Sequence, residues 1–269
     1  MKHLTDLIEY LEANHHYAQV DEMTKLALDM TDVLKEDNQL GKGLYGNFHS
    51  DFSNEDKRKL KNQLGNLPNN VGVKQYKINP YDKIAFEIDN ISENLVFIYV
   101  APYISQNTDL LTPVYNGTVS LSTMITNKIN VTQKMPGVTL SDVMEDLIQM
   151  YPNAKDQRFE VRIPLENKIL EKLKNIGVSW PDIHDKNYLL NRSTVREFLM
   201  WAAQNPEEVA SGNFTFDLST GAALFDFGMF EVKSSTPPGK QLEALRNKMA
   251  SQNNKLMEYI VKAINEILI

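Results

Sequence analysis

Four polar residues have types and spacing that suit chemistry on a phosphate group. Asp182, His184 and Asn187 form the pattern Asp-x-His-x-x-Asn, and Asp226 opens an Asp-Phe-Gly sequence further along the chain. A carboxylate can orient a hydroxyl group and accept its proton. Carboxylate and amide oxygens are also hard ligands of the kind that Mg²⁺ binds. These residues therefore predict a site where a hydroxyl group and a metal-bound phosphate meet.

Short apolar runs suggest which elements carry these residues. Tyr188-Leu189-Leu190 directly follows Asn187, and Ala222-Ala223-Leu224-Phe225 directly precedes Asp226. Runs of this kind are typical of buried strands. In this order, the two motifs resemble the catalytic loop and the metal-binding loop of the protein-kinase-like superfamily. The Asp-x-His-x-x-Asn form is most similar to aminoglycoside phosphotransferases and to compact phage and bacterial kinases.

The resemblance implies a role for each residue. Asp182 would be the catalytic base, and His184 the structural histidine of the catalytic loop. Asn187 and Asp226 would bind Mg²⁺ beside the phosphates of ATP. The family separates the base and the asparagine by five residues, as Asp182 and Asn187 are separated here.

A second register of the same stretch is less consistent with the family. His184-Asp185 resembles part of the His-Arg-Asp pattern of eukaryotic kinases, which requires Asp two residues after His and Asn five residues after Asp. Asp185 follows His184 directly, and the fifth residue after it is Leu190. We therefore expect Asp185 to be a solvated loop residue.

One departure from the family is large. Asn187 and Asp226 lie 39 residues apart, whereas the family joins them by a tight hairpin of about a dozen residues. Apolar spacing predicts a helix over residues 193–210 and a strand over residues 214–218. We expect the hairpin to re-form after this inserted segment.

A glycine-rich segment precedes these motifs. Gly41, Gly43 and Gly46 form Gly-x-Gly-x-x-Gly, followed by Phe48, and resemble the kinase loop whose backbone N–H groups approach the phosphates. A dinucleotide-binding loop would need a preceding strand, and residues 35–39 are a poor strand. A flexible linker after an N-terminal helical segment, predicted over residues 3–35, is the remaining alternative.

Five segments read as strands and would form the sheet of a kinase-like N-lobe: residues 71–78, 83–88, 95–101, 119–125 and 128–135. A charged helix is predicted over residues 54–67. Either the glycine-rich segment lies outside the sheet, or this helix is inserted before the third strand. Val71-Gly-Val-Lys74 resembles the Val-Ala-Ile-Lys of the family, which makes Lys74 the candidate phosphate-binding lysine. Lys77 and Lys83 are rivals, and Tyr99 would replace the lysine if residues 95–101 were the third strand.

The stretch Met135-Pro-Gly-Val-Thr-Leu140 resembles the hinge of aminoglycoside-type kinases. In that family the hinge backbone contacts adenine, so Met135 would lie near the base. A plain strand–turn–helix is the alternative. Helices are predicted over residues 142–150 and 165–176, with Thr139 or Ser141 as a cap, and one long helix over residues 240–269.

Composition limits the possible classes. The 269 residues carry a formal net charge of −7, which argues against a general binder of nucleic acid or of anionic membranes. No cysteine is present, which excludes disulfides and thiolate metal sites and fits a reducing cytoplasm. No apolar run approaches the ~20 residues that span a bilayer.

These patterns together predict an α+β, two-lobed protein-kinase-like fold with an antiparallel N-lobe sheet and a minimal, mainly helical C-lobe. The expected divisions are an N-terminal helical extension (1–39), an N-lobe (40–134) and a C-lobe (135–269). The predicted function is an ATP- and Mg-dependent phosphotransferase acting on a hydroxyl group, with protein Ser/Thr favoured as the acceptor. The alternatives are a pseudokinase interaction module and a small-molecule kinase.

Overall fold

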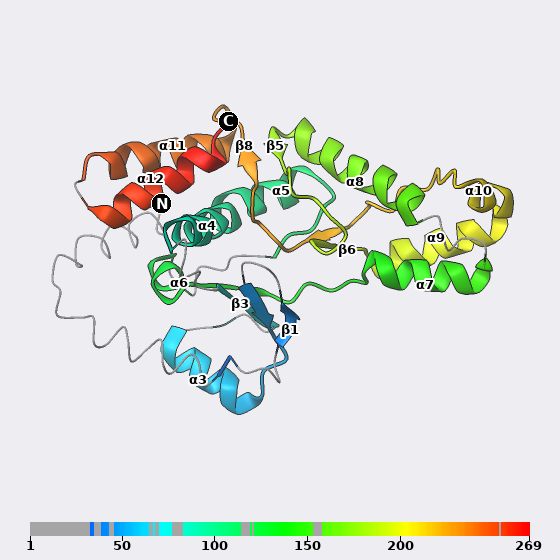
Figure 1. Ribbon diagram of the computed structural model, residues 1–269, viewed down its shortest axis with the longest axis horizontal. Helices are drawn as coiled ribbons and strands as arrows, with labels where there is room; N and C mark the ends of the chain where they lie inside the picture. Colours follow the sequence, from blue (N-terminus) through cyan, green and yellow to red (C-terminus); the bar gives the residue numbers. More distant parts are fainter. Residues whose placement is uncertain are drawn as a thin grey trace.

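The computed structural model describes residues 33–34, 39–42, 46–64, 67, 70–76, 83–113, 119, 121–152, 158–252 and 254–269. These residues form a four-stranded antiparallel sheet, two short two-stranded ladders and a set of helices (Figure 1). The predicted α+β class is confirmed. The helical segment predicted over residues 3–35 lies outside the described residues, except for Val33 and Leu34, which are buried.

The main sheet has the order β1-β2-β3-β4, and all its neighbours are antiparallel. Its strands are β1 (Gln39–Lys42), β2 (Gly46–His49), β3 (Val71–Tyr76) and β4 (Ile129–Gln133). Helix α3 (Asn54–Leu64) separates β2 from β3 in sequence. Gly41 and Gly46 of the glycine-rich segment therefore lie on strands of the sheet, and the helix precedes the third strand, which is the second of the two alternatives. The strands predicted over residues 71–78 and 128–135 are confirmed as β3 and β4.

Three predicted strands are wrong because their segments are helical. Residues 83–107 form α4 (Lys83–Leu95), a π-helical turn η3 (Val96–Val100) and α5 (Ala101–Asn107), and residues 121–127 form α6 (Leu121–Asn127). Ile88, Ile91 and Leu95 lie three and four residues apart on the buried face of α4. The β-branched and aromatic run of η3 is buried on almost every side, and a fully buried helix cannot be distinguished from a buried strand by periodicity.

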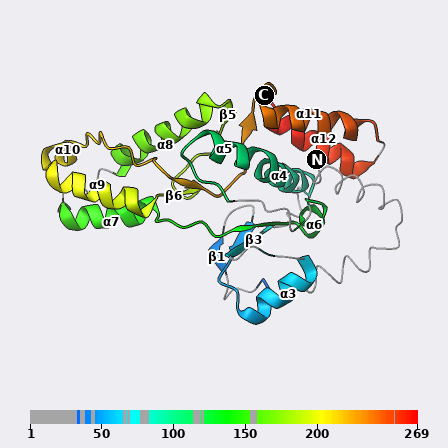
Figure 2. The same cartoon turned by 180° about the vertical axis from the view of Figure 1, so that it is seen from behind.

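The remaining elements lie beyond the sheet, as both ribbon views show (Figures 1 and 2). Strand β5 (Val178–Ser179) pairs with β8 (Glu231–Val232), and β6 (Tyr188–Leu189) pairs with β7 (Ala223–Leu224). One group of helices extends to the end of the molecule opposite α12. It comprises α7 (Leu140–Met150), α8 (Arg158–Asn175), α9 (Arg192–Gln204) and α10 (Pro206–Ser211). Helices α11 (Pro237–Ala250) and α12 (Lys255–Ile267) pack together and lie over α4.

The helices predicted over residues 142–150 and 165–176 are confirmed within α7 and α8. Thr139 caps α7: its hydroxyl accepts a hydrogen bond from Asp142 N, and the Asp142 carboxylate accepts one from Thr139 N. This reciprocal pair satisfies two backbone donors at the helix start. It also fixes where the segment after Met135 turns into the helix.

Three other predictions in this region need correction. The segment 193–210 is two helices, broken where Pro206 begins α10. Residues 214–218 form no strand; Phe214 and Phe216 instead pack on Phe198 of α9 at ring-centroid distances of 6.0 and 5.8 Å. The long helix predicted over residues 240–269 is the α11–α12 pair, and Asn254 caps the second helix. The alternating aromatic residues suggested a strand over residues 214–218. Continuous apolar spacing suggested one helix where the chain forms two, because such spacing does not reveal a break.

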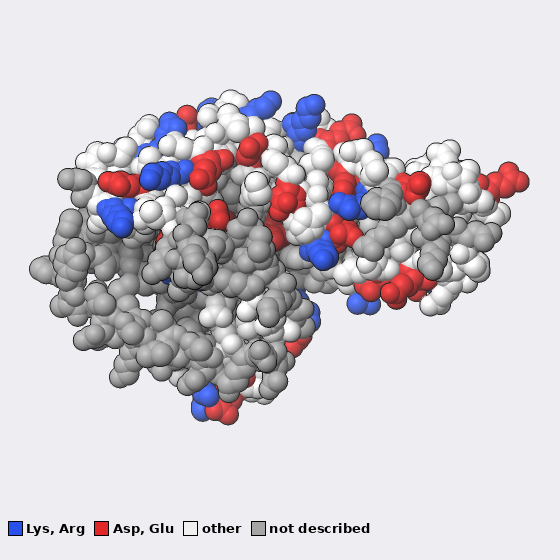
Figure 3. Space-filling model, in the orientation of Figure 1, with Lys and Arg blue, Asp and Glu red and all other residues white. Residues whose placement is uncertain are grey.

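Charged side chains of both signs are interspersed over the upper part of the face shown in Figure 3, while acidic residues gather along α7. None of the described helices is long and apolar enough to cross a membrane.

Candidate functional site

The predicted residues Lys74 and Asp226 meet at one ion-pair cluster, although 152 residues separate them. Lys74 Nζ, on β3, donates to both carboxylate oxygens of Glu93, each at 2.7 Å. The same ammonium donates to Asp226 Oδ1 at 3.2 Å. One cation from the sheet therefore joins a carboxylate of α4 to the carboxylate of the Asp-Phe-Gly sequence.

Burial makes these pairings strong. The side chains of Lys74 and Glu93 are only 16% and 6% exposed, and that of Asp226 is 35% exposed. Burial lowers the pKa of Lys74, but the charges of Glu93 and Asp226 outweigh it and hold that pKa above its ordinary value. Burial raises the pKa of Asp226, but the Lys74 ammonium and the Gly228 N–H outweigh it and hold that pKa below its ordinary value. Lys74 is thus charged and Asp226 ionised at neutral pH.

A buried asparagine network positions helix α4, which carries Glu93. Asn94 Nδ2 donates to Asn90 Oδ1 at 2.8 Å and to the backbone oxygen of Ile129 on β4 at 3.2 Å. Asn130 Nδ2, also on β4, donates back to Asn94 Oδ1 at 3.1 Å. Because buried amides must be hydrogen-bonded, this network fixes α4 against the edge strand of the sheet. Glu93 is thereby held beside Lys74.

The predicted catalytic loop is a compact turn. The side-chain amide of Asn187 donates to the backbone oxygen of Asp182 at 3.0 Å. The Asn187 N–H donates to His184 O at 2.9 Å, and His184 Nδ1 accepts from Lys186 N at 3.2 Å. The side chain of His184 thus stabilises the turn through a hydrogen bond. The Asp182 residue is exposed, while Asn187 is buried, so the loop presents a carboxylate to solvent above a fixed amide.

The hairpin between Asn187 and Asp226 re-forms as predicted, across 39 residues. Tyr188 faces Leu224 and Leu189 faces Ala223 in the β6–β7 ladder. The ladder is extended by a hydrogen bond from Phe225 N to Asn187 O at 3.3 Å. Asn187 and Asp226 therefore lie at the same end of one two-stranded ladder.

An aromatic row supports the Asp226 turn. Trp180 stacks on Phe230 at 4.7 Å between ring centroids, and Phe230 contacts Phe227 at 5.7 Å. Phe227 contacts Phe97 of η3 at 5.9 Å. Through apolar packing, this row connects the start of the predicted catalytic loop, the Asp-Phe-Gly turn and η3, which follows the helix of Glu93.

The predicted hinge passes close to the catalytic loop. Val138 and Leu190 exchange two backbone hydrogen bonds, at 3.0 and 2.8 Å. A Cβ atom at Gly137 would lie 2.5 Å from Leu189 Cβ, so a glycine is required for this approach. Met135 is half-buried in the segment between β4 and α7. Gly41 and Gly46 lie on β1 and β2, and Gly43 lies outside the described residues.

A comparison with models of protein families gives no match, and a search of curated proteins gives none either. Functional inference therefore rests on the geometry of the chain itself. Among the described residues, no group of three or more acidic or histidine side chains is arranged to hold a metal ion. Asn187 and Asp226 alone would leave most coordination positions of a Mg²⁺ ion to phosphate oxygens and water, which is how this ion is usually held beside a nucleotide.

Two residues at the ion-pair cluster were missed by sequence reasoning. Glu93 is the main one, because its segment was not assigned to a helix opposite β3. The signal was present: a carboxylate 19 residues after Lys74, on the same helix as the buried Ile91 and Leu95. Tyr76, two residues after Lys74 on the same face of β3, was also missed. Its hydroxyl is buried and lies close enough to Glu93 to influence the pKa of that carboxyl group.

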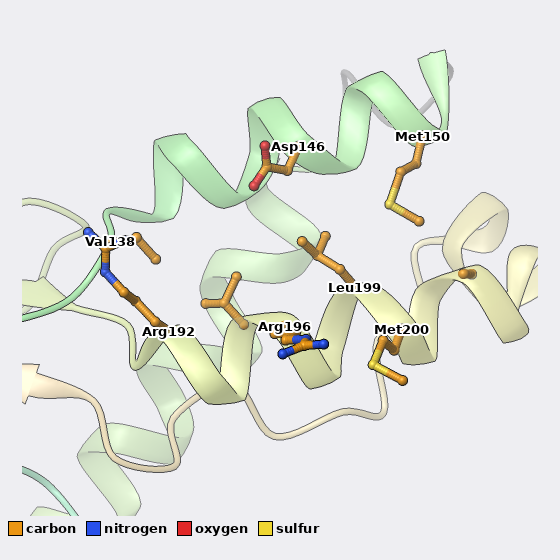
Figure 4. Close-up of a pocket in the computed structure, with 9 residues that line it drawn as sticks. Val138, Asp146, Met150, Arg192, Arg196, Leu199 and Met200 are labelled. Carbon is orange, nitrogen blue, oxygen red and sulfur yellow. The ribbon is translucent and has the colours of Figure 1, made fainter.

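A separate hollow of about 520 Å³ lies between α7 and α9 (Figure 4). Its lining is mainly apolar, and Asp146, Arg192 and Arg196 lie at its rim. It contains none of the predicted site residues. This hollow is therefore distinct from the ion-pair cluster.

Proposed function

We propose that the protein is a kinase-like phosphotransferase that uses Mg·ATP. The observation that carries the proposal is the Lys74–Glu93–Asp226 cluster, with the catalytic-loop asparagine one ladder position away. In phosphoryl transfer by kinases, a strand lysine paired to a helix glutamate contacts phosphates, and an Asp-Phe-Gly aspartate holds the metal. Three residues from distant parts of the sequence meet in that combination here.

The residues present fit the proposed cofactors. Two carboxylates face one ammonium in the cluster, which leaves a formal charge of −1 for a divalent cation to offset. The amide oxygen of Asn187 and one carboxylate oxygen of Asp226 accept no hydrogen bond from the described residues. These oxygens would hold Mg²⁺, which when bound draws negative charge from the phosphate oxygens. Lys74 would contact the phosphates, the β1–β2 hairpin would cover them, and the Met135 segment would lie along the adenine.

Asp182 is assigned as the base that orients the acceptor hydroxyl and takes its proton. Its exposure suits an acceptor presented at the surface by another macromolecule, and protein Ser/Thr is therefore the proposed acceptor class. Two features would favour a non-catalytic pseudokinase: an uncertain lysine and a lengthened hairpin. Lys74 meets both carboxylates and the β6–β7 ladder closes the hairpin, so neither feature now favours it.

The test is thermal unfolding with and without saturating Mg·ATP, in the wild type, in Asp226→Ala and in Asp146→Ala as a matched control at the distant hollow. A ligand at 100 times its Kd stabilises the folded state by about 2.7 kcal/mol. We expect a rise in Tm in the wild type and in Asp146→Ala, and none in Asp226→Ala. Transfer of labelled phosphate by the wild type, lost in Asp182→Asn, then separates an enzyme from a pseudokinase. A wild type whose Tm does not respond to Mg·ATP refutes the proposal.

A further inference from the structure

The two helices that follow the proposed metal loop contact both carboxylate-bearing segments of the site. Helix α12 packs lengthwise on α4, the helix of Glu93, and α11 packs on α12 and on η3 (Figures 1 and 2). The buried stripe of α12 consists of Met257, Ile260, Ala263, Ile264 and Ile267. None of these residues belongs to the motifs that suggested the function.

The contact with α4 occurs directly beside Glu93. Ser92 Oγ donates to the backbone oxygen of Ala263 at 3.3 Å, which places the crossing of the two helices next to the ion-paired glutamate. Ala263 is fully buried, and its small side chain permits the close approach of α4. The asparagine network holds α4 on its sheet side, so α12 covers a different side of the same helix.

The end of α12 is joined to the segment that follows Asp226. Ile269 N donates to Val232 O at 3.0 Å, and Ser234 N donates to Ile269 O at 3.1 Å. Leu268 also forms a parallel bridge with Val232 of β8. Strand β8 follows the Asp-Phe-Gly turn by three residues and pairs with β5, which leads into Trp180 and the catalytic loop.

We propose that α12 is a clamp that holds the Glu93 helix and the Asp226 loop in one fixed relation, and that the α11–α12 pair is thus a positioning element for the Lys74 cluster. Side-chain packing fixes one end of the clamp at Ser92, and backbone hydrogen bonds fix the other end at Val232. Loosening the first end lets α4 withdraw from β3, so that Glu93 leaves Lys74. The consequence for phosphate transfer rests on the proposed function, whereas the mechanical coupling does not.

The test inserts a wedge at the helix crossing. Ala263→Leu is compared with Ala202→Leu, the same substitution at an equally buried alanine on α9, remote from α4. Amide hydrogen exchange is measured without nucleotide in peptides covering residues 83–95, 223–232 and 192–204. In Ala263→Leu we expect exchange about tenfold faster in both of the first two segments and unchanged in the third, since locally opened units exchange together. Ala202→Leu should affect only the third segment.

A milder pair covers the case in which the wedge prevents folding. Ile260→Val removes one methyl group from the α12 stripe, and Ile169→Val makes the same change at a buried position on α8. The first should show a smaller increase at residues 83–95 and 223–232, and the second none. Exchange that rises at α4 alone, or equally throughout the chain, overturns the clamp.

A double variant tests whether the clamp acts through Glu93. Phosphate transfer should fall by about tenfold or more in Ala263→Leu and should fall no further when Ala263→Leu is added to Glu93→Gln. Losses that instead multiply would indicate a merely structural effect and overturn the positioning role. If the exchange results hold but the wild type does not bind Mg·ATP, the proposed function fails and the mechanical clamp stands.

Discussion

At the scale of single residues, Lys74 is the centre of the site. Its ammonium is largely removed from water and is held by two carboxylates that come from a helix and a loop. Removing one partner of a buried ion pair leaves an uncompensated charge, which costs more than the pair itself contributes. Glu93 is the partner at risk, because burial raises its pKa, Lys74 lowers it by less, and Asp226 raises it further.

A double-mutant cycle at Lys74 and Glu93 tests this dependence. Lys74→Met should lower the free energy of unfolding by about 3 kcal/mol, because Glu93 is left buried and unpaired. Glu93→Leu added to Lys74→Met should recover much of that loss, since the most deeply buried carboxylate is then gone and the more exposed Asp226 keeps its hydrogen bond from Gly228 N. Urea denaturation of the wild type, both single variants and the double variant measures the coupling. Additive losses would contradict the buried pairing.

The sequence alone identified the residues whose spacing is local. Asp182, His184 and Asn187 lie in one turn, so their order predicted their neighbourhood. Lys74 was a candidate, beside Lys77 and Lys83, because of the three residues before it. Glu93 could not be identified in the same way, because its role depends on which face of α4 meets β3. Tyr76 is a similar case: only the sheet register and the burial of β3 show that it faces the site.

At the scale of secondary-structure elements, the errors have one physical origin. Residues 96–100 are β-branched or aromatic and would suit a strand by propensity. Tertiary burial instead keeps them helical, as a π turn that continues α4. The predictions of β3 and β4 are confirmed. In each case the apolar run has clear ends, and the two strands pair with each other in one sheet.

The inserted segment α9–α10 should be energetically separate from the site. Phe198 is buried at the centre of a cluster with Trp201, Phe214 and Phe216. Phe198→Ala should therefore cost about 3–5 kcal/mol of stability. The rise in Tm on adding Mg·ATP should nevertheless remain, as measured by thermal unfolding of the variant. If Mg·ATP did not raise the Tm of this variant, the insert would also shape the nucleotide site.

The contact between α12 and α4 has a pH-dependent weakness at Glu266. Partial burial raises the pKa of Glu266 above its ordinary value of 4.5, and the charge of Asp89 on α4 raises it further. A carboxyl group with a raised folded-state pKa favours folding below pH 4.5, and this contribution is lost as pH rises through the folded-state pKa.

Glu266→Gln removes that ionisation while keeping a polar side chain of the same shape. At neutral pH the variant should have a higher Tm than the wild type, and the difference should shrink to nothing below pH 4.5. Thermal scans across this pH range measure the difference. A Tm gap that stays constant down to the acid end would show that the charge of Glu266 is not its cause.

At the scale of the whole molecule, the ion-pair cluster joins β3 of the sheet to α4 and to the turn after β7, while the hollow lies between α7 and α9 (Figure 4). Nucleotide binding should thus be insensitive to the hollow. Met200 lines the hollow, and its side chain is 55% exposed. Met200→Asp places a charge there, and the rise in Tm with Mg·ATP should match that of the wild type. A smaller rise in Tm would indicate that the nucleotide binds nearer to α9.

The packing of α12 on α4 is the part of the architecture that the sequence could not reveal. The apolar stripe of α12 predicted a buried face, but a stripe does not identify its partner. Residues 135–269 were expected to form one lobe, yet α12 from this range packs on α4 from residues 40–134. Long-range pairing of this kind depends on the whole chain path.

The β6–β7 ladder has a further consequence, for the order of folding. The chain leaves the site after β6 and returns to it at β7, with residues 190–222 between the two strands. Chain-closure entropy grows with the logarithm of loop length, so this excursion costs only about 1 kcal/mol more than a loop of a dozen residues. A ladder of two residue pairs cannot nucleate such a closure by itself. We therefore expect α9 and α10 to collapse around their aromatic cluster first, and Asn187 and Asp226 to come together late in folding.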